Sequence, residues 1–169
     1  MAVNTSVLKI FAPAMRRQLM EGVSRKLNLL INTKTPDTLT TYAKQIENLR
    51  EKQDENRDQL IEKVAYTWFN RLCALRYLDA KNWHPFGCKV LMPSYKGETE
   101  PELLKLMRSD SLPLELKIFT EEKRLNQLLD NQIPTTLKGG DPQGEVYREL
   151  VLAACRSYHH LLPDLFEGL

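Results

Sequence analysis

The chain has 169 residues, the length of one domain that is large enough to bury a hydrophobic core. Hydrophobic residues make up 42% and charged residues 27%, which excludes a disordered or collagen-like chain. Lys and Arg number 24 against 22 Asp and Glu, which excludes a uniformly basic protein, so any basic surface must be local. We expect a single helical domain over residues 1–169.

The first predicted element is a helix over about residues 7–31. Pro13 suits an early helical position because its missing N–H would be unpaired there. Apolar residues then recur at three- and four-residue steps. A break is predicted at residues 32–37, and a second helix begins near residue 38. We expect that helix to jog near residues 54–56, inside a charged stretch without Gly or Pro.

Residues 57–81 have the strongest helical periodicity in the chain. Two loops are predicted, at 82–100 and at 134–144, and the first has one short extended piece at 88–92. Between them we expect a short helix at 101–108 and another from Thr120; a final helix over about 145–161 precedes Pro163. Strand-like alternation is essentially absent. The sequence therefore predicts an all-α fold, an irregular bundle of about five to six helices with no substantial sheet.

The segment "AYTWFNRLCALRYLDA", residues 65–80, mixes aromatic rings with charges. A helical wheel puts Trp68 and Phe69 on a broad apolar face, which predicts core positions. Arg71 and Arg76 project between apolar residues, and Asp79 lies near the middle of the apolar arc. Arg76 and Asp79 are three residues apart, so we expect them to pair inside the core, where an unpaired charge is costly. A ligand-binding role for the arginines is the alternative.

The last helix carries one apolar stripe, and Tyr147 and Tyr158 are predicted core residues on it. His159 and His160 diverge by about 100° on a helix, so they are poorly placed to hold one metal. The three cysteines have neither disulfide-framework nor Cys-x-x-Cys spacing. We expect free thiols, two of them in the core. Charges interrupt the first apolar stretch, which predicts neither a membrane span nor a signal peptide and indicates a cytoplasmic protein.

No phosphate loop, nucleophile elbow or zinc-protease motif occurs with a suitable context, so we expect that this chain alone is not an enzyme, with no cofactor or metal. A local basic cluster does occur early in the chain. It would contact DNA phosphates with salt-dependent affinity, or form a solvated helix face. Its members are Lys9, Arg16, Arg17, Arg25 and Lys26.

Two blocks, "AYTWFNRLCALRYLDA" and "YRELVLAACRSYHHLLPDLFE" (residues 147–167), together with "FAPAMRRQL" in the opening helix, resemble the N-terminal region of the PglX family. These are adenine-specific DNA methyltransferases of bacteriophage-exclusion (BREX) defence systems. The resemblance implies a much longer parent protein that uses S-adenosylmethionine to methylate adenine. The family's Asn/Asp-Pro-Pro-Tyr/Phe catalytic motif does not occur in these 169 residues, so no catalytic or cofactor-binding residue is carried over.

The resemblance implies a helical module that precedes the methyltransferase domain. Its expected partners are DNA, through the full-length parent, the methyltransferase domain of the same polypeptide and other BREX subunits. The main alternative is a self-standing helical interaction or regulatory module. A compact DNA-binding regulator would need a helix-turn-helix, which the helices from Thr120 onward do not offer.

Overall fold

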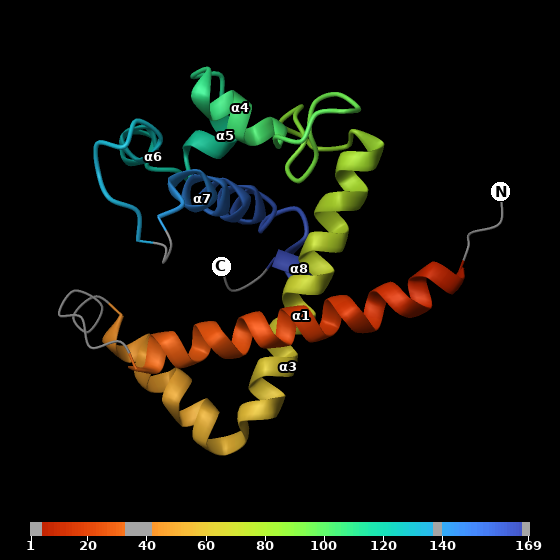
Figure 1. The fold of residues 1–169 in the computed structure, drawn as a ribbon, viewed down its shortest axis with the longest axis vertical. Coiled ribbons are helices and arrows are strands. Elements are labelled where there is room, and N and C mark those ends of the chain that lie inside the picture. Colours follow the sequence, from red (N-terminus) through yellow and green to blue (C-terminus); the bar gives the residue numbers. More distant parts are fainter. Residues whose placement is uncertain (1–4, 33–41, 137–139, 167–169) are drawn as a thin grey trace. The chain divides into compact units, whose positions relative to one another are not determined.

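The computed structural model describes residues 5–32, 42–136 and 140–166 (Figure 1). Within these ranges there is no strand, and Lys96 and Glu98 form one isolated bridge. The predicted all-α fold is therefore confirmed. The helices are α1 (Thr5–Asn32), α3 (Ala43–Lys81), α4 (Glu102–Arg108), α5 (Leu114–Lys117), α6 (Glu122–Leu129), α7 (Pro142–Ser157) and α8 (Pro163–Phe166).

The chain divides into two compact units, Met1–Asn70 and Arg71–Leu169, and each is described by itself. The prediction that residues 1–169 form one domain stays a prediction. Of the two predicted loops, residues 82–100 contain no helix, whereas α7 begins inside the second at Pro142. Residues 137–139 of that second loop lie outside the described residues.

In the first unit, apolar side chains of α1 and α3 line a common groove, among them Leu27 of α1 and Leu49 and Leu60 of α3. The buried hydrophobic residues described in this unit are Leu27, Ile46, Ile61 and Ala65. A polar clamp joins the same two helices: the Arg57 guanidinium donates to Ser24 Oγ and Asn28 Oδ1, each at 3.0 Å. Arg57 of α3 is thus hydrogen-bonded to two side chains that lie one helical turn apart on α1.

The helix α3 is bent at Asn56, which has an extended backbone (φ −162°, ψ 93°) between two helical halves. Figure 1 shows this bend. The Asn56 side chain accepts a hydrogen bond from the backbone N–H of Gln59 at 3.0 Å, as an N-cap does at the start of a helix. The jog predicted near residues 54–56 is confirmed.

In the second unit, α7 is the central helix, and α4, α5 and α6 all pack against it. Small residues of α7, Ala153, Ala154 and Cys155, are fully buried and let neighbouring elements approach closely. At its end, Tyr158 stacks on Phe166 of α8 with ring centroids 5.3 Å apart. Burial raises the pKa of the Cys155 thiol to about 11. The prediction that two of the three cysteines lie in the core is confirmed by Cys88 and Cys155.

Several element boundaries differ from the sequence prediction. The last helix begins at Pro142 rather than near residue 145, because Asp141 Oδ1 accepts from the Gly144 N–H at 2.8 Å and caps it. A Cβ atom at Gly144 would meet the Asp141 carboxylate, so a larger residue there would require the Asp141 side chain to move. The last helix ends at Ser157 rather than near residue 161, and Pro163, which does lie past its end, begins the short helix α8. The predicted extended piece at 88–92 forms no strand.

Asn56→Ala should remove the cap of the second half of α3 and lower the free energy of unfolding by about 0.5 to 2 kcal/mol. Asn56→Asp keeps an acceptor and should stay near the wild type. Urea denaturation followed by circular dichroism measures both, with the exposed Asn48→Ala as the control on the same helix. Equal stability of the Ala and Asp variants would contradict a capping role.

Candidate functional site

The five predicted DNA-contacting residues all lie on α1 and are exposed. A helix advances about 100° per residue, so Lys9 and Arg16 share one side to within about 20°. Arg25 lies about 160° to 180° from them, and Arg17 and Lys26 project at intermediate angles. The structure thus spreads the basic residues around the helix rather than gathering them in one patch. Their contact with DNA stays a prediction.

Arg16 differs from the other four in having an ionic partner, Glu62 of α3. Among the residues that the structure describes, Lys9, Arg17, Arg25 and Lys26 form no ion pair. An exposed pair such as Arg16–Glu62 stabilises a protein little. It does join the two helices at the rim of a groove.

That groove, of about 1090 Å³, lies between α1 and the second half of α3 within the first unit. Pro13 and Met20 line it from α1, and Ala65, Tyr66 and Phe69 line it from α3. Tyr66 is largely exposed. The lining is mainly apolar, so the groove is suited to contact with an apolar surface.

Trp68 and Phe69 were both predicted as core residues, and both are half-buried. Trp68 lines a second, smaller groove with Leu27 of α1 and Leu49 of α3. The apolar face of α3 spans more than a third of the helix circumference, and α1 covers part of it. The aromatic residues at the edges of that face therefore line grooves.

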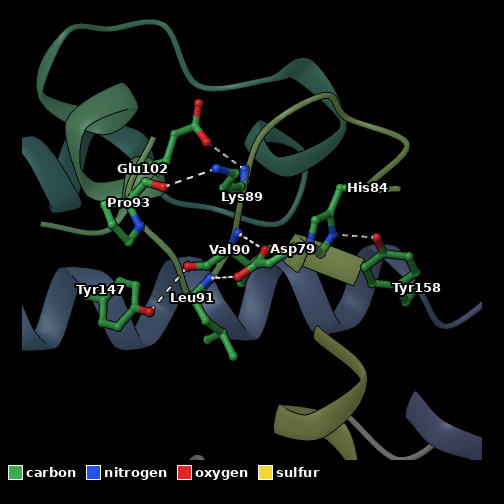
Figure 2. Close-up of polar contacts among 9 residues, drawn as sticks. All are labelled: Asp79, His84, Lys89, Val90, Leu91, Pro93, Glu102, Tyr147 and Tyr158. Atoms are coloured by element: carbon green, nitrogen blue, oxygen red, sulfur yellow. Dashed lines mark hydrogen bonds and ion pairs between the residues drawn. The ribbon is translucent and has the colours of Figure 1, made fainter. Parts of the chain in front are cut away.

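A buried polar network joins the end of α3 to the following loop and to α7. Figure 2 shows Asp79 at its centre. Its Oδ1 accepts from the Val90 N–H at 2.7 Å, and its Oδ2 accepts from the Leu91 N–H at 2.8 Å. His84 Nε2 lies 2.6 Å from Oδ1, and His84 Nδ1 lies 2.6 Å from the Tyr158 hydroxyl.

The hydrogen bonds indicate which of Asp79, His84 and Tyr158 donates and which accepts. With Asp79 as acceptor, His84 Nε2–H donates to it, and in a neutral imidazole Nδ1 then accepts from the Tyr158 hydroxyl. Burial, and then the Asp79 charge, raise the pKa of Tyr158, which keeps its hydroxyl protonated. The same two causes raise the pKa of Tyr147 to about 12, and Tyr147 donates to the Val90 carbonyl at 3.2 Å.

The order carboxylate, imidazole, hydroxyl has the composition of a proton relay, but the three groups are closed off from solvent. Asp79, His84 and Tyr158 are all buried. Across the described ranges, no buried side-chain nitrogen or oxygen lacks a hydrogen-bond partner. The network therefore holds the 82–92 loop against α3 and α7 and leaves no polar atom turned toward a substrate.

The predicted Arg76–Asp79 pair is wrong. Arg76 is exposed, and the Asp79 oxygens accept instead from His84 and from two backbone N–H groups. Arg76 is three residues from Asp79 along α3, but the loop after α3 places the Val90 and Leu91 N–H groups against the Asp79 carboxylate. Arg71 is buried as predicted, and its Nε donates to the Leu165 carbonyl at 3.0 Å, where it anchors the segment that holds α8.

A second buried carboxylate, Glu145 of α7, was missed in the sequence. It accepts from the Thr135 hydroxyl and the Thr136 N–H, each at 2.6 Å, and pairs with Arg124 of α6. Burial by itself would raise the pKa of Glu145, but these hydrogen bonds lower it from 4.5 to about 2. No sequence signal distinguishes it from an exposed Glu in a first helical turn.

The described part of the chain contains no group of three His, Cys, Asp or Glu side chains that could hold a metal ion. His159 and His160 are exposed, with ring centroids 5.3 Å apart. None of the described helices combines the length and the apolarity that a membrane crossing requires.

The chain is similar to two curated proteins along nearly its whole length. It is 26% identical over 99% of its length to an adenine-specific methyltransferase BrxX from Escherichia coli O9:H4 (strain HS). It is 28% identical over 98% of its length to an adenine-specific methyltransferase PglX from Lacticaseibacillus casei (strain Zhang). The predicted resemblance to PglX methyltransferases is confirmed.

The chain spans 15% of the length of the first relative and 16% of the second. No family model matches it, and no solved structure matches it significantly. The similarity therefore concerns a small part of each methyltransferase.

Asp79→Asn should lower the free energy of unfolding by about 3 to 5 kcal/mol. Both Asp79 oxygens accept hydrogen bonds, and the substitution replaces one of them with an NH₂ group that would face a donor. Arg76→Ala, on the same turn but exposed, should leave stability near the wild-type value. Urea denaturation compares the two. A clear loss in Arg76→Ala beside a neutral Asp79→Asn would contradict the assigned network.

Glu145 should make stability fall with acidification. Its pKa is lower in the folded chain than the ordinary 4.5, so its contribution is complete above pH 4.5 and is lost as the pH falls toward 2. Glu145→Gln should cost about 2 to 3 kcal/mol at pH 7, and the gap from wild type should narrow below pH 4.5. Denaturation curves between pH 7 and 2 measure this, with exposed Glu115→Gln as control. A constant gap would contradict the linkage.

Proposed function

We propose, from the similarity to adenine-specific methyltransferases along nearly the whole chain, that this protein is a non-catalytic N-terminal helical module of a site-specific adenine DNA methyltransferase in a BREX phage-defence system. The coverage of 98–99% of the chain by these relatives carries the proposal. The parent would use S-adenosylmethionine in the cytoplasm, and this module would supply neither the cofactor site nor the catalytic motif.

In this role the module supports DNA engagement, or packs on the methyltransferase domain or on partner subunits. An enzyme that extrudes adenine from a duplex must hold the opened DNA, and positive surface lowers the cost of doing so. The exposed cations Arg17, Arg25 and Lys26 support contact with phosphates. The groove between α1 and α3 supports packing on an apolar face of the catalytic part.

The coding sequence beyond Leu169 tests this proposal most directly. We expect an open reading frame that continues into an Asn/Asp-Pro-Pro-Tyr/Phe motif. A reading frame that stops without one would favour the alternative, a self-standing helical interaction or regulatory module.

The complete protein provides the functional test. Deletion of residues 1–169 should reduce adenine methylation of DNA by at least about tenfold, the loss expected when a few phosphate contacts or a domain interface is removed. Binding of S-adenosylmethionine to the remaining protein should persist, since the cofactor site lies elsewhere. Tritiated methyl transfer and calorimetric cofactor binding measure the two quantities. Unchanged methylation after the deletion would sink the proposed role.

A further inference from the structure

Three exposed side chains meet where α3 ends, and we name them the α3-end cluster: Tyr77, Lys81 and Trp83. The exposed fraction is 54% for Tyr77 and 62% for Trp83. Their ring centroids are 6.0 Å apart, and the ring planes meet at 80°. Lys81 Nζ lies 5.8 Å from the centroid of the Tyr77 ring, within the range of a cation–π contact.

The backbone beneath the Trp83 ring is fixed on both sides. The Trp83 N–H donates to the Leu78 carbonyl at 3.0 Å, and the Asn82 N–H donates to the Asp79 carbonyl at 3.2 Å. Asn82 has a left-handed backbone (φ 53°), so these bonds form a Schellman helix end. The next residue, His84, is buried in the Asp79 network. An exposed ring on a fixed backbone loses little entropy when it binds.

Exposed cations occur in the same stretch of chain as the α3-end cluster. From Arg76 to Gly97 the sequence has four Lys or Arg and one carboxylate, that of buried Asp79. Arg76, Lys81 and Lys96 form no ion pair with any residue that the structure describes.

The next carboxylates along the loop already have partners. Glu98 pairs with Lys105 at 2.5 Å, and this hydrogen bond is the main cause of its lowered pKa. Glu100 pairs with Arg108 at 2.9 Å. Glu102 accepts from the Lys89 N–H at 2.9 Å. These three carboxylates therefore already have partners in the loop or in α4.

We propose that the α3-end cluster is a stacking contact for an unpaired base of DNA, with Arg76 and Lys81 attracting the neighbouring phosphates. Exposed aromatic rings among cations bind single-stranded nucleic acid because every base has a face that stacks and every phosphate a charge. The inference rests on the proposed function in taking DNA as the nucleic acid. A methyltransferase that opens a duplex creates unpaired bases, which this contact would hold.

The 169-residue chain has two tryptophans, so Trp68→Phe leaves Trp83 as its only one. In that background, titration with a 12-nucleotide oligothymidylate at low salt should quench Trp83 emission. The same sequence paired in a duplex should bind more weakly, because its bases are already stacked. Affinity for the single strand should fall as salt rises, as phosphate contacts require.

Trp83→Ala should weaken oligothymidylate binding by about tenfold, and Trp83→Phe should keep most of the affinity, because a ring remains for stacking. Anisotropy of a labelled oligonucleotide measures both. Tyr42→Ala removes an exposed ring from the first unit and is the matched control. Equal affinity of Trp83→Ala and Tyr42→Ala, no binding at low salt, or tighter binding of the duplex would each overturn the inference.

The two proposals fail separately. If Trp83 proves irrelevant while deletion of residues 1–169 still abolishes methylation by the complete protein, the stacking contact is wrong and the proposed function stands. If Trp83 stacks on oligothymidylate while the deletion leaves methylation unchanged, the base-binding contact stands without the methyltransferase role.

Discussion

The carboxylate of Asp79 is the interaction on which most of the second unit's geometry depends. It lies in the last turn of α3 and accepts from two successive backbone N–H groups of Val90 and Leu91. Residues 82–100 have no helix and no ladder of their own, so their buried donors need such an acceptor. Through His84 the same carboxylate orients Tyr158 at the end of α7. One side chain thereby fixes a helix end, a loop and the central helix.

Glu145 solves the same problem for a second irregular segment. It binds Thr135 and Thr136, which precede α7, and Arg124 of α6. Each buried carboxylate therefore replaces the backbone pairing that regular structure would supply. Buried ionic groups of this kind specify one arrangement of the loops, and removing one partner leaves the others unpaired in the interior. The buried carboxylates Asp79 and Glu145 of the second unit thus serve to hold its loops in place.

Periodicity predicted the long helices, because long amphipathic segments repeat their pattern many times. The jog in α3 was predicted from the charged stretch that interrupts that pattern. Two features could not be predicted this way. The helices α5 and α8 are four residues each, too short for a period to appear. The partners of Asp79 and Glu145 come from loops whose path no local pattern encodes. A wheel places Arg76 near Asp79 in angle, but it does not show which donors arrive from elsewhere in the chain.

The bend at Asn56 lets the two halves of α3 run in different directions without a connecting loop. The first half of α3 contacts α1 through Arg50, which donates to the Ile31 carbonyl, and the second half through Arg57, which donates to Ser24. Such an arrangement would ordinarily take three helices and a second connecting loop of about two to eight residues. Here the change of direction uses a single extended residue whose side chain caps the second half of the helix. No loop separates the two halves, so an insertion at this position would displace the Asn56 cap from the second half of the helix rather than lengthen a loop.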